Sequence, residues 1–157
     1  MKFSTDAKDS TRREFCAQAC QVASLLAAGA LAGCGGGTPT SPSDNVPSLA
    51  SVSASVSGRT VSITIDSGLG SVGSAATTRT SLGTFLIART AQDSFTVLTA
   101  TCTHESCTIT GFASSRYVCP CHGSQFNTSG TVAMGPASRS LQQYSSQFNN
   151  GVLTFSV

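Results

Sequence analysis

Residues 102–107 read Cys-Thr-His-Glu-Ser-Cys, and residues 119–124 read Cys-Pro-Cys-His-Gly-Ser. These two stretches contain both histidines of the 157-residue chain and four of its seven cysteines. One cysteine and one histidine from each stretch give two thiolates and two imidazoles. This donor set suits either a single Zn²⁺ ion or a [2Fe–2S] cluster. The sequence therefore predicts a metal centre held between two loops.

Other chemistries fit these spacings less well. Covalent haem attachment needs Cys-x-x-Cys-His, and the run from Cys119 to His122 is one residue short of that motif. A cysteine–histidine nucleophilic pair would leave the repeated arrangement unexplained. Structural zinc remains the main alternative, although zinc sites usually present Cys-x₂₋₄-Cys pairs and these loops show Cys-x-His and Cys-x-x-His.

The sequence on both sides of the loops has the two-residue hydrophobic period of β-strands. No segment after residue 48 has a helical period, and the Gly- and Ser-rich residues 67–83 are expected to form a loop. The expected strands are a hairpin around Ser57-Gly58, a pair at 85–89 and 95–98, short strands at 116–118 and 125–126, and segments 141–148 and 152–157 around Asn149-Asn150-Gly151. We expect an all-β domain over residues 48–157, a sandwich or small barrel with the metal ligands on a subdomain of loops.

The N-terminal residues 1–33 have the features of a targeting segment. Arg12 and Arg13 precede an apolar stretch, which resembles a twin-arginine export signal. The stretch ends in Leu-Ala-Gly-Cys at residues 31–34, which resembles a bacterial lipobox and implies that Cys34 carries lipid. An uncleaved membrane helix is the alternative. Both interpretations predict a membrane-anchored domain on the periplasmic, extracytoplasmic face.

Residues 34–47 are rich in Gly, Ser, Thr and Pro and are expected to form a flexible linker. Beyond Cys34 the chain contains five arginines, no lysine and four acidic residues, a net charge of +1. Nucleic-acid binding requires a basic surface that can contact phosphates. We therefore expect no nucleic-acid partner.

The paired loops, together with Gly135-Pro136-Ala137, resemble the Rieske iron–sulfur proteins of cytochrome bc-type complexes. The resemblance implies that Cys102 and Cys119 bind one iron of a single [2Fe–2S] cluster, and that His104 and His122 bind the other. It also implies a disulfide between Cys107 and Cys121 that joins the loops. Ser124 matches the family serine whose hydroxyl donates to a bridging sulfide.

Two positions depart from the family pattern. High-potential members carry a tyrosine that donates to a cluster cysteine where this chain has Phe126. The family usually has leucine after the first histidine, at the apolar tip that meets cytochrome b, and this chain has Glu105. The sequence therefore predicts a potential below that of a tyrosine-bearing relative, and a tip less suited to an apolar quinol pocket.

The resemblance implies one-electron transfer as a quinol-oxidising or respiratory-chain subunit, with a cytochrome or an oxidoreductase large subunit as redox partner. Quinol itself is a possible donor. The chain is expected to be a component of an enzyme and not an enzyme acting alone. Two alternatives stay open at this point: the small Rieske subunit of a periplasmic oxidoreductase such as arsenite oxidase, and a structural zinc lipoprotein.

Overall fold

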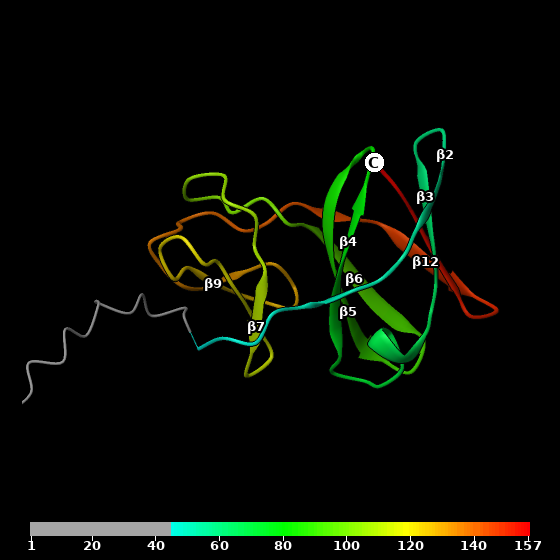
Figure 1. The fold of residues 1–157 in the computed structure, drawn as a ribbon, viewed down its shortest axis with the longest axis horizontal. Helices are drawn as coiled ribbons and strands as arrows, with labels where there is room; N and C mark the ends of the chain where they lie inside the picture. Colours follow the sequence, from blue (N-terminus) through cyan, green and yellow to red (C-terminus); the bar gives the residue numbers. More distant parts are fainter. Residues whose placement is uncertain (1–44) are drawn as a thin grey trace, which may run out of the picture. The chain divides into compact units, whose positions relative to one another are not determined.

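Three β-sheets make up the part of the chain that the structure, a computed structural model, describes, which is residues 45–157 (Figure 1). One short 3₁₀ helix, η1 (Ser67–Leu69), is the only helix within that range. The strands are β1 (Ala50–Ser51), β2 (Ser55–Ser57), β3 (Thr60–Thr64), β4 (Ala75–Thr80), β5 (Gly83–Ala91), β6 (Ser94–Thr99), β7 (Gly111–Ala113), β8 (Arg116–Val118), β9 (Gln125–Asn127), β10 (Val132–Met134), β11 (Gln143–Tyr144), β12 (Ser146–Asn149) and β13 (Val152–Ser156).

The central sheet has the strand order β1-β4-β5-β6-β11. A second sheet has the order β12-β13-β3-β2, and a third, built from the middle of the chain, has the order β10-β9-β8-β7. All pairings are antiparallel except the short parallel contact of β1 with β4. The third sheet carries both Cys/His loops at the ends of its strands, so the fold separates a β-sandwich from a metal-binding subdomain.

Strand β5 shows why the central sheet lies between two cores. Successive side chains of a strand point to opposite faces, and here both sets are apolar. Phe85 and Ile87 pack into a core shared with the β3–β13 sheet, while Leu86 and Ala88 pack into a core shared with the metal-binding subdomain. All four are almost completely buried. A strand that is buried on both faces has a continuous run of apolar residues in its sequence, as residues 85–88 show.

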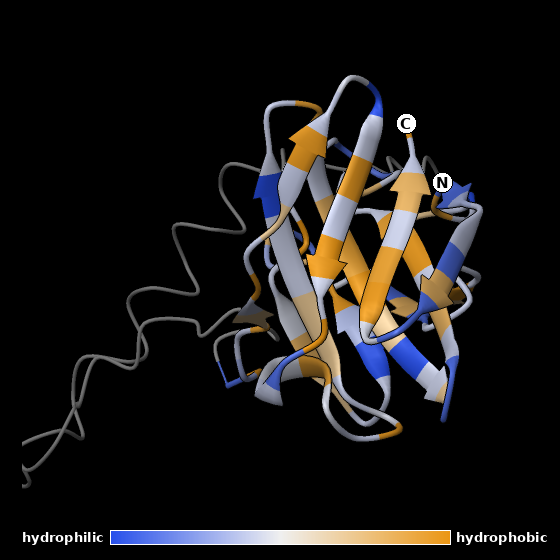
Figure 2. Cartoon of the chain, turned by 90° about the vertical axis from the view of Figure 1, so that its right-hand side faces the viewer, coloured by the Kyte–Doolittle hydropathy of each residue, from blue (hydrophilic) through white to orange (hydrophobic). Residues whose placement is uncertain are grey.

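The outer sheet has only one buried face and keeps a strict alternation. Val61 and Ile63 of β3 and Leu153 and Phe155 of β13 point into the sandwich core, and the residues between them are polar. This alternation is visible as bands of contrasting hydropathy along the strands in Figure 2. The all-β class predicted from the sequence is therefore confirmed, as are the pairings β2–β3, β5–β6 and β12–β13.

The prediction that residues 67–83 form a loop was wrong. Strand β4 lies within this segment and pairs with β5 from Ala75 to Thr80. Its sequence, Ala-Ala-Thr-Thr-Arg-Thr, lacks the large apolar residues by which strands are usually recognised. Ala76 and Thr78 are nevertheless fully buried, because small and β-branched side chains fit a sheet that is packed on both sides.

The segment 141–148, expected to be one strand, is divided between two sheets. Strand β11 pairs with β6 in the central sheet, and β12 pairs with β13 in the outer sheet. At the start of β12 the hydroxyl of Ser146 donates to the carbonyl of Phe95 in β6 over 3.3 Å. The chain thus passes from the central sheet to the outer sheet at one edge of the sandwich. The hydrophobic period of the sequence does not reveal where this change of sheet occurs.

The predicted export signal, the predicted lipidation site Cys34 and nearly all of the predicted linker lie outside the described residues. The predicted linker continues to residue 47, of which only 45–47 are described. Among residues 45–157, no helix has both the length and the apolar character needed to cross a membrane.

Candidate metal centre

The two Cys/His loops lie at the same end of the small sheet β10-β9-β8-β7. The first loop, residues 102–107, connects β6 to β7, and the second, residues 119–124, connects β8 to β9. Both begin where a strand ends: Val118 closes β8, and Thr101 forms an isolated bridge with Thr108 at the base of the first loop. The sheet therefore holds the four predicted ligands on two adjacent turns.

The loops have the same backbone hydrogen bonds. In the first, the Cys102 N–H donates to the Cys107 carbonyl over 2.8 Å, and the Ser106 N–H donates to the Cys102 carbonyl over 2.9 Å. In the second, the Cys119 N–H donates to the Ser124 carbonyl over 2.9 Å, and the Gly123 N–H donates to the Cys119 carbonyl over 3.0 Å. Each loop is thus a closed six-residue turn that fixes its first cysteine.

This turn requires a left-handed residue at its fifth position. Gly123 has φ 72°, which costs glycine little because it has no Cβ. The first loop places Ser106 there with φ 58°, a conformation that few non-glycine residues adopt. Such conformations persist only where the surroundings enforce them. Here the neighbouring residue, Cys107, is covalently tied to the second loop.

A disulfide joins Cys107 to Cys121, as the family resemblance implies. It links residues 14 positions apart and connects the two loops across the site. Cys102 and Cys119 are left as free thiols, each 1% exposed. The pair that the resemblance assigns to iron is therefore reduced and shielded from water.

Burial raises the pKa of the Cys119 thiol, and the adjacent thiol of Cys102 raises it further. Hydrogen bonds that the sulfur accepts from the backbone N–H groups of Cys121 and His122 act in the opposite direction and lower the pKa. When a metal cation binds, each thiol loses its proton, and the positive charge of the cation compensates the negative charge of the thiolate.

The two histidines lie at the surface of the same site. The ring centroids of His104 and His122 are 4.9 Å apart with an interplanar angle of 87°. A carboxylate oxygen of Glu105 lies 3.7 Å from Nδ1 of His122, and the two side chains are 61% and 46% exposed, respectively. Ring nitrogens of both histidines and this carboxylate all lie within 4.8 Å of one another. The imidazoles can therefore meet a docking partner.

The segment Gly135-Pro136-Ala137, called the proline loop below, contacts the site through Ser124. This residue is fully buried, and its hydroxyl oxygen accepts the backbone N–H of Ala137 over 3.0 Å. Because the oxygen accepts from Ala137, the hydroxyl hydrogen is free to donate elsewhere. The sequence Gly135-Pro136-Ala137 thus holds Ser124 as a donor beside the second loop.

These residues fit a [2Fe–2S] cluster. The same two loops contribute two buried free thiols and two exposed imidazoles, and the buried Ser124 hydroxyl at the end of the second loop has a hydrogen to donate. A single cation could also use His104, Glu105 and His122, but that grouping would leave the two buried thiols unused. The assignment of Cys102, His104, Cys119 and His122 as the individual ligands stays a prediction.

The sequence analysis missed two residues beside the site, Thr103 and Arg139. The hydroxyl of Thr103 donates to the Arg139 carbonyl over 2.6 Å, which attaches the segment after the proline loop to the first Cys/His loop. Both residues line a groove of about 530 Å³ that also includes Cys102 and His104. The available signal was the position of Arg139, three residues after Pro136.

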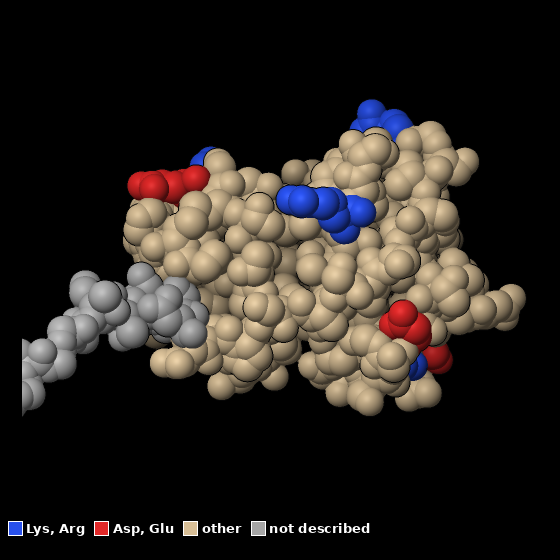
Figure 3. All heavy atoms as spheres, in the orientation of Figure 1, with Lys and Arg blue, Asp and Glu red and all other residues tan. Residues whose placement is uncertain are grey.

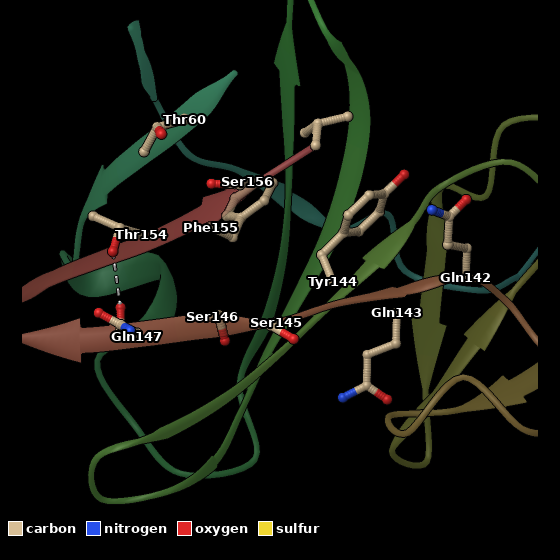
Figure 4. A pocket seen from close by; sticks show the side chains of 11 residues that line it. Thr60, Gln142, Gln143, Tyr144, Ser145, Ser146, Gln147, Thr154, Phe155 and Ser156 are labelled. Carbon is tan, nitrogen blue, oxygen red and sulfur yellow. Dashed lines mark hydrogen bonds between the residues drawn. The ribbon is translucent and has the colours of Figure 1, made fainter. Parts of the chain in front are cut away.

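A larger groove, of about 660 Å³, lies elsewhere, along β11, β12 and β13 (Figure 4). It is lined mainly by glutamine, serine and threonine side chains together with Tyr144 and Phe155. None of its lining residues is a histidine, a cysteine or a charged side chain. Its size therefore does not make it the functional site.

Comparison with known families supports the site. The model of the Rieske [2Fe-2S] domain matches residues 43–145, which include both loops and the proline loop. The cytochrome b6-f complex iron-sulfur subunit 1 of Nicotiana tabacum is 39% identical over 59 residues, 37% of this chain and 26% of that protein. The corresponding subunit of Cyanothece sp. is 36% identical over 69 residues, 41% of this chain and 38% of that protein.

Among solved structures, the plasma membrane Rieske protein PetC3 of Synechocystis PCC 6803 is 27% identical, with a TM-score of 0.48 over 53% of this chain and 86% of that one. The chain spans well under half the length of the two curated relatives. The likeness to those relatives is therefore a likeness of the domain that carries the loops.

Proposed function

The chain belongs to the Rieske [2Fe–2S] domain family, so it binds one such cluster and transfers electrons through it, and we propose that it serves as a membrane-attached subunit of a quinol-oxidising or other respiratory chain. The observation that carries the proposal is that the same two loops contribute a pair of neighbouring, exposed imidazoles and two buried thiols. The relatives named as cytochrome b6-f subunits support the same role.

In this proposal Cys102 and Cys119 would hold one iron of the cluster, and His104 and His122 would hold the other. When bound, the cluster supplies reversible one-electron chemistry at a raised potential, since two neutral imidazoles replace two thiolates. The buried thiols keep water from the inner side, while the exposed rings bring the outer side within reach of a partner. A ring N–H or ring nitrogen at the surface can hydrogen-bond a quinol hydroxyl.

The other residues of the site tune and maintain it. Ser124 holds a hydroxyl hydrogen available for a sulfide, and its oxygen is fixed by the Ala137 N–H. The disulfide between Cys107 and Cys121 keeps the loops together and fits an oxidising compartment outside the cytoplasm. That location agrees with the proposed twin-arginine signal and with lipid attachment at Cys34. Attachment by an N-terminal helix is the alternative anchor.

Rapid mixing of native membranes with a short-chain quinol tests the proposal. The chain, produced in its own membranes, should develop the reduced-state Rieske EPR signal within the turnover time of the complex. Membranes carrying Cys102→Ser should show no such signal, because one thiolate of the cluster is missing. If the intact chain is reduced by a low-potential ferredoxin but not by quinol, the quinol-linked role is wrong while the cluster remains.

A further inference from the structure

A polar groove runs beside the cluster site on the side of His104. It has a volume of about 530 Å³, and its lining includes His104 and Cys102, one predicted ligand of each iron, but not His122. The rest of the lining is mostly hydroxyl-bearing, from Thr99, Thr101, Thr103, Ser106 and Ser140. The groove therefore offers hydrogen-bond donors directly next to the predicted ligands.

Arg139 gives this groove its only formal charge. None of the lining residues is acidic. Within residues 45–157, the Arg139 guanidinium has no ion pair and no hydrogen bond. By contrast, Arg89 donates to backbone carbonyls and Arg116 to the side chain of Gln125. Among the described residues, Arg139 is therefore a cation beside the site that forms no ion pair.

The backbone of Arg139 is held in place even though its side chain is free. Its carbonyl accepts the Thr103 hydroxyl over 2.6 Å, and Thr103 is the residue between Cys102 and His104. The guanidinium thus starts from a point fixed to the first loop. A charge beside the site can steer an oppositely charged partner to it.

The two histidines have a carboxylate beside them. The carboxylate of Glu105 lies 3.7 Å from Nδ1 of His122, lies within 4.8 Å of a ring nitrogen of each histidine, and does not line the groove. The face shown in Figure 3 contains few Lys, Arg, Asp or Glu side chains. A partner would meet an anion at the two histidines and a cation in the groove next to them.

We propose that the Arg139 groove is a docking site for a carboxylate on the electron acceptor, a protein that carries a one-electron cofactor behind an acidic surface. This inference rests on the proposed electron-transfer function and names the partner class of the same site. The partner carboxylate would pair with the guanidinium and accept from the groove hydroxyls, and its cofactor would then lie near His104. One electron leaves the reduced cluster, and the acceptor cofactor is reduced by one electron.

Stopped-flow oxidation of the reduced, cluster-loaded full chain tests the proposal. The probes are plastocyanin, whose docking surface is acidic, and mitochondrial cytochrome c, whose docking surface is basic. We expect Arg139→Gln to slow the reaction with plastocyanin by about threefold to tenfold at low ionic strength and to weaken its salt dependence. The reaction with cytochrome c should not slow.

A change in the reduction potential of the cluster cannot explain a slower reaction of Arg139→Gln with plastocyanin. Loss of a nearby cation destabilises the reduced state, which carries one more negative charge, so Arg139→Gln should give electrons up more readily. A slower reaction with plastocyanin must then come from weaker docking. The matched control is Arg116→Gln, which removes an exposed arginine of β8 outside the groove and should leave both rates unchanged.

The two proposals fail in different ways. Equal rates for the wild type and Arg139→Gln, or an equal slowing by Arg116→Gln, would overturn the docking site while the EPR signal remained. The absence of a Rieske EPR signal in the wild type would overturn the proposed function itself. Slowing of cytochrome c by Arg139→Gln to the same degree as plastocyanin would show that the effect is not one of charge, and would also refute the docking site.

Discussion

The substitution Phe126→Tyr should raise the reduction potential of the cluster. Phe126 is fully buried on β9 and lies opposite Tyr117 of β8 in the sheet register. Cys119 follows two residues later on the same face as Tyr117, which makes Phe126 and Cys119 diagonal neighbours across the strand pair. Diagonal Cβ atoms lie about 7–8 Å apart, within reach of an aromatic side chain. A hydroxyl on the Phe126 ring can therefore approach the cysteine sulfurs.

The magnitude follows from the charge that reduction adds. A hydrogen bond to a charged group contributes about 1.5–3 kcal/mol, and the bond is weaker to the less negative oxidised state. A difference of about 1 kcal/mol between the two states corresponds to roughly 40 mV, since a one-electron couple changes by about 59 mV for each tenfold change in equilibrium constant. We expect an increase of about 20–60 mV.

An EPR-monitored redox titration of both proteins measures this shift, with circular dichroism to show that the fold is unchanged. The matched control is Tyr117→Phe, which removes a hydroxyl from the facing strand. That hydroxyl is buried and has no hydrogen-bond partner among the described residues. The control should leave the potential where it is. An unchanged or lower potential in a folded, cluster-loaded Phe126→Tyr protein would refute the reasoning.

Three further predictions concern stability. Ser124→Ala should destabilise the domain by about 1–3 kcal/mol in urea unfolding and lower the potential, since it leaves the buried Ala137 N–H without an acceptor and removes a donor; equal stability would contradict this. Replacing Cys107 and Cys121 together by serine should cost about 3 kcal/mol, as expected for a loop of this length, and should speed loss of iron to a chelator; unchanged chelation kinetics would show that the bridge does not hold the site. Burial raises the pKa of the Tyr117 hydroxyl above its ordinary value of 10.0, so the unfolded state loses this proton first as the pH rises. The free energy of unfolding should therefore fall by about 1.4 kcal/mol per pH unit above pH 10. The variant Tyr117→Phe should abolish that pH dependence.

The parts of the fold that the sequence predicted are those where at least one face of a strand carries large apolar residues. The strands predicted from the alternation of Val61 and Ile63 and from the apolar run Phe85 to Ala88 are present in the structure, because these side chains are buried in the cores. Strand β4 was missed because its buried positions, Ala76 and Thr78, are small. Their place in the sheet is set by the neighbouring strands, and no local pattern records it.

The candidate site divides in the same way. The two loops were found because metal ligands are chemically distinctive and regularly spaced. Arg139 was not found, because its significance lies in the contact between Thr103 and the Arg139 carbonyl, 36 residues apart in sequence. Ser106 is another such residue, since its left-handed backbone is a property of the closed loop and not of serine.

The measurement that tests the central claim most directly combines metal analysis with EPR on the full chain, produced in a host that assembles iron–sulfur clusters. The account predicts two irons and two acid-labile sulfides per chain, with the rhombic spectrum of a Rieske centre after reduction. Loss of that spectrum in Cys102→Ser and Cys119→Ser, and a changed spectrum in His104→Cys and His122→Cys, would assign the ligands. A protein that contains one zinc, no sulfide and no EPR signal on reduction would contradict the account.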